Sequence, residues 1–218
     1  MTDAGVALMP LALAWAAYFA LHSALASLAV KRRVATRRPQ WMPWYRLAYN
    51  GIALALLLPL LAWTLAWPGP FVWEWRGAWR WLGDGLAILA ALGFLWTLRD
   101  YDGAEFLGLR QARTGERRVE DQERLHLSVL HRFVRHPWYA LGLVLLWTRD
   151  MDAARLVAAT LASGYLLVGL RLEEGRLVAL HGDVYRDYRR RVPALLPRPW
   201  RWLRRADAEA LRRRARER

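Results

Sequence analysis

Hydrophobic residues in this chain gather into long stretches, and the charged residues lie between and after them. The apolar stretches cover residues 6–30, 45–67, 81–98, 138–147 and 156–170. A helix needs about 20 consecutive apolar residues to cross the hydrocarbon core of a bilayer. The first three stretches are about that long, and the two shorter ones predict a helical hairpin that is shallow or tilted. The pattern therefore predicts an all-α polytopic membrane bundle of about five transmembrane segments.

The distribution of basic residues predicts the orientation of these segments. The chain has 33 lysines and arginines, 19 acidic residues and a formal net charge of +14. If the loop over residues 31–46 lies inside, 29 of the 33 basic residues fall on the inner side. The other four are Arg76, Arg80, Arg149 and Arg155. Because cytoplasmic loops carry the excess of positive charge, we predict an outer N-terminus and a cytoplasmic C-terminus in the inner membrane.

Composition excludes several classes of site and partner. The chain has no cysteine, which excludes disulfides, thiolate metal ligands and a covalent thiol mechanism, and we predict no metal site. A basic chain binds either nucleic acid or an anionic membrane surface. No nucleic-acid-binding signature accompanies the charge, so the bilayer is the predicted partner and nucleic acid is not.

Polar motifs gather on the side that is predicted to be cytoplasmic. The run from Arg135 to Tyr139 precedes and begins the fourth apolar stretch, and Pro137 suits the first turn of a helix. Glu173 and Glu174 follow the fifth stretch. Since these two stretches form the predicted hairpin, the motifs should meet at one end of it. A third motif over residues 182–188 contains Tyr185 and Tyr188 and leads to Val192-Pro193.

Each motif also has a purely structural interpretation. Arg135 and His136 beside a membrane helix are consistent with a snorkelling pair. Paired glutamates at a helix end are consistent with solvation or an ion pair, and spaced tyrosines with interface anchors. Ionisable residues at membrane depth are nevertheless candidates for function, and all three motifs lie on the side that is predicted to be cytoplasmic.

In order and spacing, the motifs over residues 126–197 resemble the isoprenylcysteine carboxyl methyltransferase superfamily. Residues 21–27, 45–50 and 106–111 resemble more narrowly the bacterial methanethiol S-methyltransferase and NnrU-like group of membrane proteins. The chain departs from its relatives at three positions. Val129 and His131 replace a Gly-x-Tyr element, and Leu141 stands where a glycine is common.

The resemblance implies an integral bacterial inner-membrane methyltransferase that uses S-adenosyl-L-methionine. The implied acceptor is a small or lipophilic thiol, similar to methanethiol, or an isoprenylcysteine or lipid. The alternative is a non-catalytic accessory protein of the denitrification-associated NnrU type. Three regions are expected: a three-helix transmembrane region over 1–98, a methyltransferase region over 99–200 with a cytoplasmic cofactor-binding part, and a basic tail over 201–218 near anionic lipid.

The cofactor carries a carboxylate, an amine, ribose hydroxyls and an adenine, and the motifs offer a partner for each. Arg135 is expected to bind the carboxylate, while Glu173 and Glu174 accept from the amine and ribose. The expected cofactor-binding residues are Arg135, His136, Pro137, Tyr139, Glu173, Glu174, Tyr185 and Tyr188. Arg135, His136 and Glu174 are the expected catalytic residues, with His136 acting either as the base for a thiol proton or as a structural hydrogen-bonding group.

Two polar residues lie inside the first two apolar stretches. His22 and Asn50 are costly in hydrocarbon, so they are expected to face the bundle interior. One interpretation is a hydrogen bond between helices, and the other is the lining of a substrate entrance. We further expect the acceptor to reach the cofactor from within the membrane, because charged segments cover its aqueous side.

The orientation is testable with fused reporters. A reporter that is active only in the periplasm should stay silent after Arg218 and become active after Pro70, since the basic segments remain inside. Activity measured in intact cells checks both fusions. A silent fusion after Pro70 together with an active one after Arg218 would reverse the topology.

Overall fold

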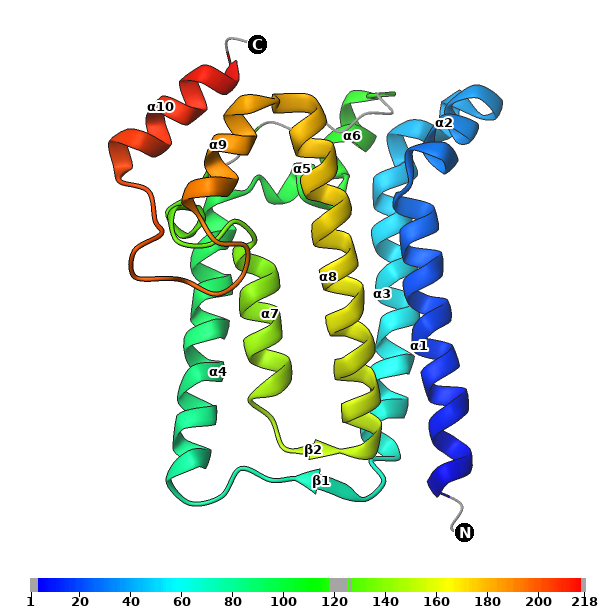
Figure 1. Cartoon of the computed structure of the whole chain (residues 1–218). Helices are drawn as coiled ribbons and strands as arrows, with labels where there is room; N and C mark the ends of the chain where they lie inside the picture. The colour runs from blue at the N-terminus through cyan, green and yellow to red at the C-terminus, as the bar shows by residue number, and fades with distance from the viewer. Residues whose placement is uncertain (1–3, 118–124, 126, 217–218) are drawn as a thin grey trace. The chain divides into compact units, whose positions relative to one another are not determined.

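The computed structural model describes residues 4–117, 125 and 127–216, and nearly all of its regular structure is helical (Figure 1). Its long helices are α1 (Ala4–Ala26), α3 (Met42–Ala66), α4 (Ala78–Thr97) and α8 (Ala153–His181). The shorter helices are α2 (Leu28–Arg37), α5 (Gly103–Leu107), α6 (Leu109–Thr114), α7 (Pro137–Trp147), α9 (Asp183–Arg191) and α10 (Arg205–Arg216). Three single turns, η1 (Pro39–Trp41), η2 (Leu98–Asp100) and η3 (Leu130–Arg132), and two strands, β1 (Phe71–Trp73) and β2 (Met151–Asp152), complete the fold.

Within the described ranges, four helical stretches are long and apolar enough to cross a membrane. They are Leu8–Ala26, Pro39–Ala66, Ala78–Asp100 and Ala153–His181. The fifth apolar helix, α7, has 11 residues and is about 16 Å long, against about 30 Å for the hydrocarbon core. The prediction of an all-α membrane protein is confirmed, and the predicted count of about five becomes four long helices and one short one.

Helix α8 differs most from its prediction. The expected apolar stretch over 156–170 is only the middle of a 29-residue helix that continues to His181. Arg171, Glu173 and Arg176 are polar but good helix formers, so the polar change at residue 171 does not end the helix. The helix ends at Gly182, whose φ of 54° favours glycine. Glu173 and Glu174 therefore lie inside a helix and have more than a full turn of helix after them.

The chain forms two compact units that interleave along the sequence. The first contains residues 1–75, 101–121 and 150–162, and the second contains residues 76–100, 122–149 and 163–218. The expected regional boundaries at 98 and 200 stay a prediction. The predicted loop over 99–134 includes residues 118–124 and 126, which lie outside the described residues.

In the first unit, α1 packs along α3 and against the start of α8. Its core contains Leu11, Trp15, Leu60, Ala154 and Ala158. The Trp15 indole N–H donates to the hydroxyl of Thr64 at 3.1 Å. Both buried polar groups are therefore hydrogen-bonded within the apolar core.

Strands β1 and β2 pair antiparallel, with Phe71 opposite Asp152 and Trp73 opposite Met151 (Figure 1). The Trp75 amide donates to Asp150 Oδ1 at 2.8 Å, and Ala153 N donates to Pro70 O at 3.0 Å. The α3–α4 and α7–α8 connections therefore lie side by side. Both connections were predicted on the outer side, so the pairing agrees with that topology, and the side itself stays a prediction.

The connection after α4 is attached to the beginning of α3. Arg46 donates to Glu105 O at 3.1 Å, and Asn50 donates to Phe106 O and Leu107 O at 3.1 and 3.2 Å. Gly108 has a φ of 90°, and a Cβ atom there would stand 2.6 Å from Leu47 N. Only glycine permits this close approach of α5 and α6 to α3.

In the second unit, α4 packs against α7, and the Trp138 indole donates to Thr97 Oγ1 at 2.9 Å. Leu141 lies so close to Gly93 that a Cβ atom on Gly93 would be 3.1 Å from it. The expected basic tail contains α10, which buries Ala208 and Leu211 in a core with α9. Apolar residues three positions apart on this arginine-rich helix give it one buried face.

Two glycines with positive φ provide a matched test of the α3 contact. Gly115 has a φ of 69° and open space around its Cβ position, so Gly115→Ala should cost only the left-handed backbone penalty, about 1–2 kcal/mol. Gly108→Ala adds a clash with the α3 backbone and should lower the thermal unfolding temperature further. Equal shifts for the two variants in detergent would contradict the close packing at Gly108.

Candidate functional site

The predicted motifs meet in the second unit, at the N-terminus of α7. The amides of Arg135 and His136 donate to Pro193 O at 2.9 Å and Ala194 O at 3.0 Å. Pro137 then occupies the first turn of α7, as predicted, and is buried. This backbone pairing fixes both side chains before the helix begins and directs them toward α8.

Arg135 and Glu174 form a buried ion pair. Arg135 Nε donates to Glu174 Oε1 at 2.6 Å, and the two side chains are 9% and 6% exposed. Arg135 Nη1 also donates to the carbonyls of Val192 and of Arg189, the latter at 3.1 Å. Removing one member would leave a buried charge without its partner, which typically costs 3–5 kcal/mol.

His136 lies between the two glutamates. Its Nε2 is 3.2 Å from Glu174 Oε1 and its Nδ1 is 3.5 Å from Glu173 Oε2. Burial alone would lower the pKa of His136, but the hydrogen bonds and charges of both glutamates outweigh it and raise this pKa above its ordinary value. Because both ring nitrogens face carboxylates, the geometry favours the structural alternative over a base that accepts a thiol proton.

Tyr139 and Arg189 complete the network. The Tyr139 hydroxyl donates to Glu173 Oε2 at 3.2 Å, and its ring stacks on His136 with centroids 5.4 Å apart. Arg189 Nε is 3.1 Å from Glu174 Oε2. Sequence reasoning missed Arg189, which is one of three consecutive arginines in α9. The available signal was helical spacing, since Arg189 lies one turn after the motif residue Tyr185.

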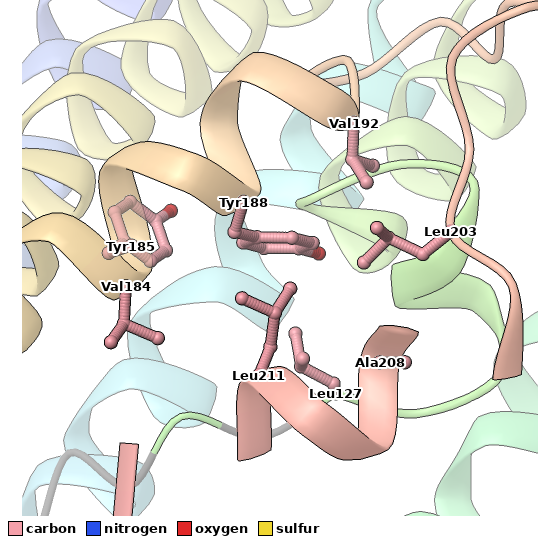
Figure 2. Packing of buried hydrophobic residues seen from close by; sticks show 8 residues of the cluster. All are labelled: Leu127, Val184, Tyr185, Tyr188, Val192, Leu203, Ala208 and Leu211. Atoms are coloured by element: carbon pink, nitrogen blue, oxygen red, sulfur yellow. The ribbon is translucent and has the colours of Figure 1, made fainter. Parts of the chain in front are cut away.

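Tyr185 and Tyr188 lie in a packed core, each only 1% exposed. Figure 2 shows their rings near Leu127, Val184 and Leu211, with the helix that carries Ala208 and Leu211, α10, below them in the view. The Tyr188 hydroxyl donates to His131 O at 2.6 Å, and burial raises the pKa of both phenols. These contacts support the site from behind, and direct binding of a cofactor by either ring stays a prediction.

The three positions that depart from the relatives have local roles. His131 accepts from Tyr188 through its carbonyl, and its Nδ1 is 2.8 Å from Ser128 Oγ. Val129 is exposed, and Leu141 packs on Gly93 of α4. His131 therefore fixes the turn in front of Arg135, while Leu141 belongs to the α4–α7 contact.

His22 and Asn50 lie in the first unit and not in the one that holds Arg135. The Tyr49 hydroxyl is 2.6 Å from His22 Nε2, so this pair joins α1 to α3. Asn50 binds the last carbonyls of α5. These contacts favour the interhelical interpretation of both residues, and the substrate entrance stays a prediction.

Known proteins resemble this chain over most of its length. Methanethiol S-methyltransferase 2 of Bradyrhizobium diazoefficiens is 33% identical over 204 residues, which are 90% of this chain and 76% of that protein. Methanethiol S-methyltransferase of Mycobacterium tuberculosis is 38% identical over 160 residues, which are 69% of this chain and 61% of that protein. No family model matches the chain, and no solved structure does.

The raised pKa of His136 predicts a pH-dependent stability. Its contribution is fully present below about pH 6.5, the ordinary histidine value, and is lost as pH rises through the raised folded-state pKa. Thermal unfolding of the wild-type protein should therefore shift downward over that window, and His136→Gln should remove the shift. An identical pH dependence in His136→Gln would rule out this histidine as the source.

Proposed function

Since this chain belongs to the methanethiol S-methyltransferase family, we propose that it transfers a methyl group from S-adenosylmethionine to methanethiol or another small apolar thiol. This membership supports the expectation of a membrane methyltransferase over the alternative of a non-catalytic accessory protein. The observation that carries the proposal is the charged network of Arg135, His136 and Glu174, which joins motifs that are far apart in the sequence.

The network offers the aromatic, carboxylate and guanidinium groups that are needed to bind S-adenosylmethionine. S-adenosylmethionine supplies an electrophilic methyl group on a sulfonium. When the thiol sulfur bonds to this methyl group, the methyl–sulfonium bond breaks, and the products are a methyl thioether, S-adenosylhomocysteine and a proton. Tyr139 offers a flat ring, Glu173 a half-exposed carboxylate and Arg189 a half-exposed guanidinium. We place the cofactor beside these residues, with Arg135, His136, Pro137 and Glu174 holding them in position and Tyr185 and Tyr188 behind them.

Catalysis then rests on positioning and on exclusion of water, because the leaving group is already activated. The rigid attachment of residues 135–136 to residues 193–194 provides the positioning. The short helix α7, which contains no charged residue, begins directly at this network. An acceptor that partitions into the membrane reaches the site along this side, whereas a strongly charged acceptor would cross hydrocarbon at considerable cost.

Purified full-length protein in lipid nanodiscs allows both parts of the proposal to be measured. We expect saturable binding of S-adenosylmethionine and formation of the methyl thioether from methanethiol, followed by gas chromatography. Across straight-chain alkyl thiols, kcat/KM should rise about fourfold per added methylene until the pocket is full, since a buried methylene contributes about 0.8 kcal/mol.

The outcomes separate the alternatives. Equal or better turnover of glutathione than of an alkyl thiol of similar acidity would rule out entry from the membrane. Binding of S-adenosylmethionine without turnover of any thiol would favour an isoprenylcysteine or lipid acceptor, to be assayed next. Failure to bind S-adenosylmethionine would overturn the proposed function and favour the non-catalytic alternative.

A further inference from the structure

The two arginines, two glutamates and one histidine of the network differ sharply in exposure. Arg135, His136 and Glu174 are 9%, 5% and 6% exposed, whereas Glu173 is 38% and Arg189 is 45% exposed. The network therefore has a buried part made of three residues and an accessible part made of two. A soluble ligand meets the accessible part first.

The buried part is already committed to the protein. Arg135 donates to Glu174, to Val192 O and to Arg189 O. The Oε1 atom of Glu174 contacts Arg135 and His136, and its Oε2 atom contacts Arg189. For Arg135 to bind a ligand carboxylate, it would have to leave a desolvated partner, which is a costly exchange.

The accessible part has opposite charges that are held in place by the buried part. Glu173 is oriented by the Tyr139 hydroxyl at 3.2 Å and by His136, and Arg189 is oriented by Glu174 at 3.1 Å. Each side chain is anchored on one side and open on another, so little conformational entropy remains to be lost on binding. A group that can bind an anion and a group that can bind a cation are thus both attached to the same buried part of the network.

We infer that Arg189 and Glu173 together bind the zwitterionic amino-acid end of the methyl donor. Arg189 binds its carboxylate and Glu173 binds its ammonium group, while Arg135 and Glu174 act as positioning residues. This inference rests on the proposed function, and it moves the carboxylate contact from Arg135, where sequence reasoning put it, to Arg189. A zwitterion also leaves the net charge of the network unchanged.

Product analogues that each lack one charged group test the assignment by binding alone. The ligands are S-adenosylhomocysteine, its decarboxylated analogue and its deaminated analogue, measured by calorimetric titration of the full-length protein. A charge-assisted hydrogen bond changes affinity by about tenfold to a hundredfold. Arg189→Gln should weaken the binding of S-adenosylhomocysteine by that factor and leave the affinity for the decarboxylated analogue unchanged.

Glu173→Gln should give the complementary result. It should weaken the binding of S-adenosylhomocysteine by a similar factor and leave the affinity for the deaminated analogue unchanged. Arg190→Gln is the matched control, because Arg190 neighbours Arg189, is 73% exposed and lies 3.5 Å from Asp187 instead of Glu174. It should change none of the three affinities.

Other outcomes are decisive as well. If Arg189→Gln weakens S-adenosylhomocysteine and its decarboxylated analogue equally, or weakens neither, Arg189 does not bind the carboxylate. If Arg189→Gln fails to fold, Arg189→Lys decides, since it should keep the preference for S-adenosylhomocysteine over the decarboxylated analogue, and loss of that preference with a normal unfolding temperature overturns the inference. If the wild-type protein binds none of the ligands, the proposed function itself fails.

Discussion

Arg135 and Glu174 join the N-terminus of α7 to the interior of α8 through a desolvated ion pair, and the rest of the site is arranged around that contact. A buried guanidinium must satisfy its donors locally, and Arg135 does so with Glu174 and with the carbonyls of Val192 and Arg189. That requirement draws the segment after α9 against the start of α7. Tyr139, His136 and Arg189 then take their positions relative to two fixed carboxylates.

The sequence predicted those features of the fold that depend on local periodicity and local chemistry. All five apolar stretches are largely helical, although the first is interrupted at Ser27, just before α2 begins. Pro137 begins α7 because a missing amide hydrogen costs nothing in a first turn. The convergence of Arg135 and Glu174 followed from treating α7 and α8 as a hairpin. The length of α8 did not follow, because hydropathy reports where a helix is apolar and not where it ends.

The resemblance to a known superfamily carried the chemistry further than periodicity did, and membership of the methanethiol S-methyltransferase family is now established. It could not distinguish a residue that binds a ligand from one that supports it, since both belong to the same motif. Burial provides a criterion for that distinction: Tyr188 stands at a motif position, yet it is buried and its hydroxyl donates to His131 O. Conversely, Arg189 was not among the predicted site residues, although its guanidinium contacts the same Glu174 carboxylate as Arg135.

The packing of α10 over α9 has a consequence for the order in which the protein is made. Leu203, Ala208 and Leu211 complete the core around Tyr185 and Tyr188, and they follow every described membrane helix in the chain. During synthesis, the helices can enter the bilayer while that core still lacks one wall. The support behind the charged network can therefore be completed only after α10 has been synthesised, so a nascent chain halted before α10 has an unfinished site.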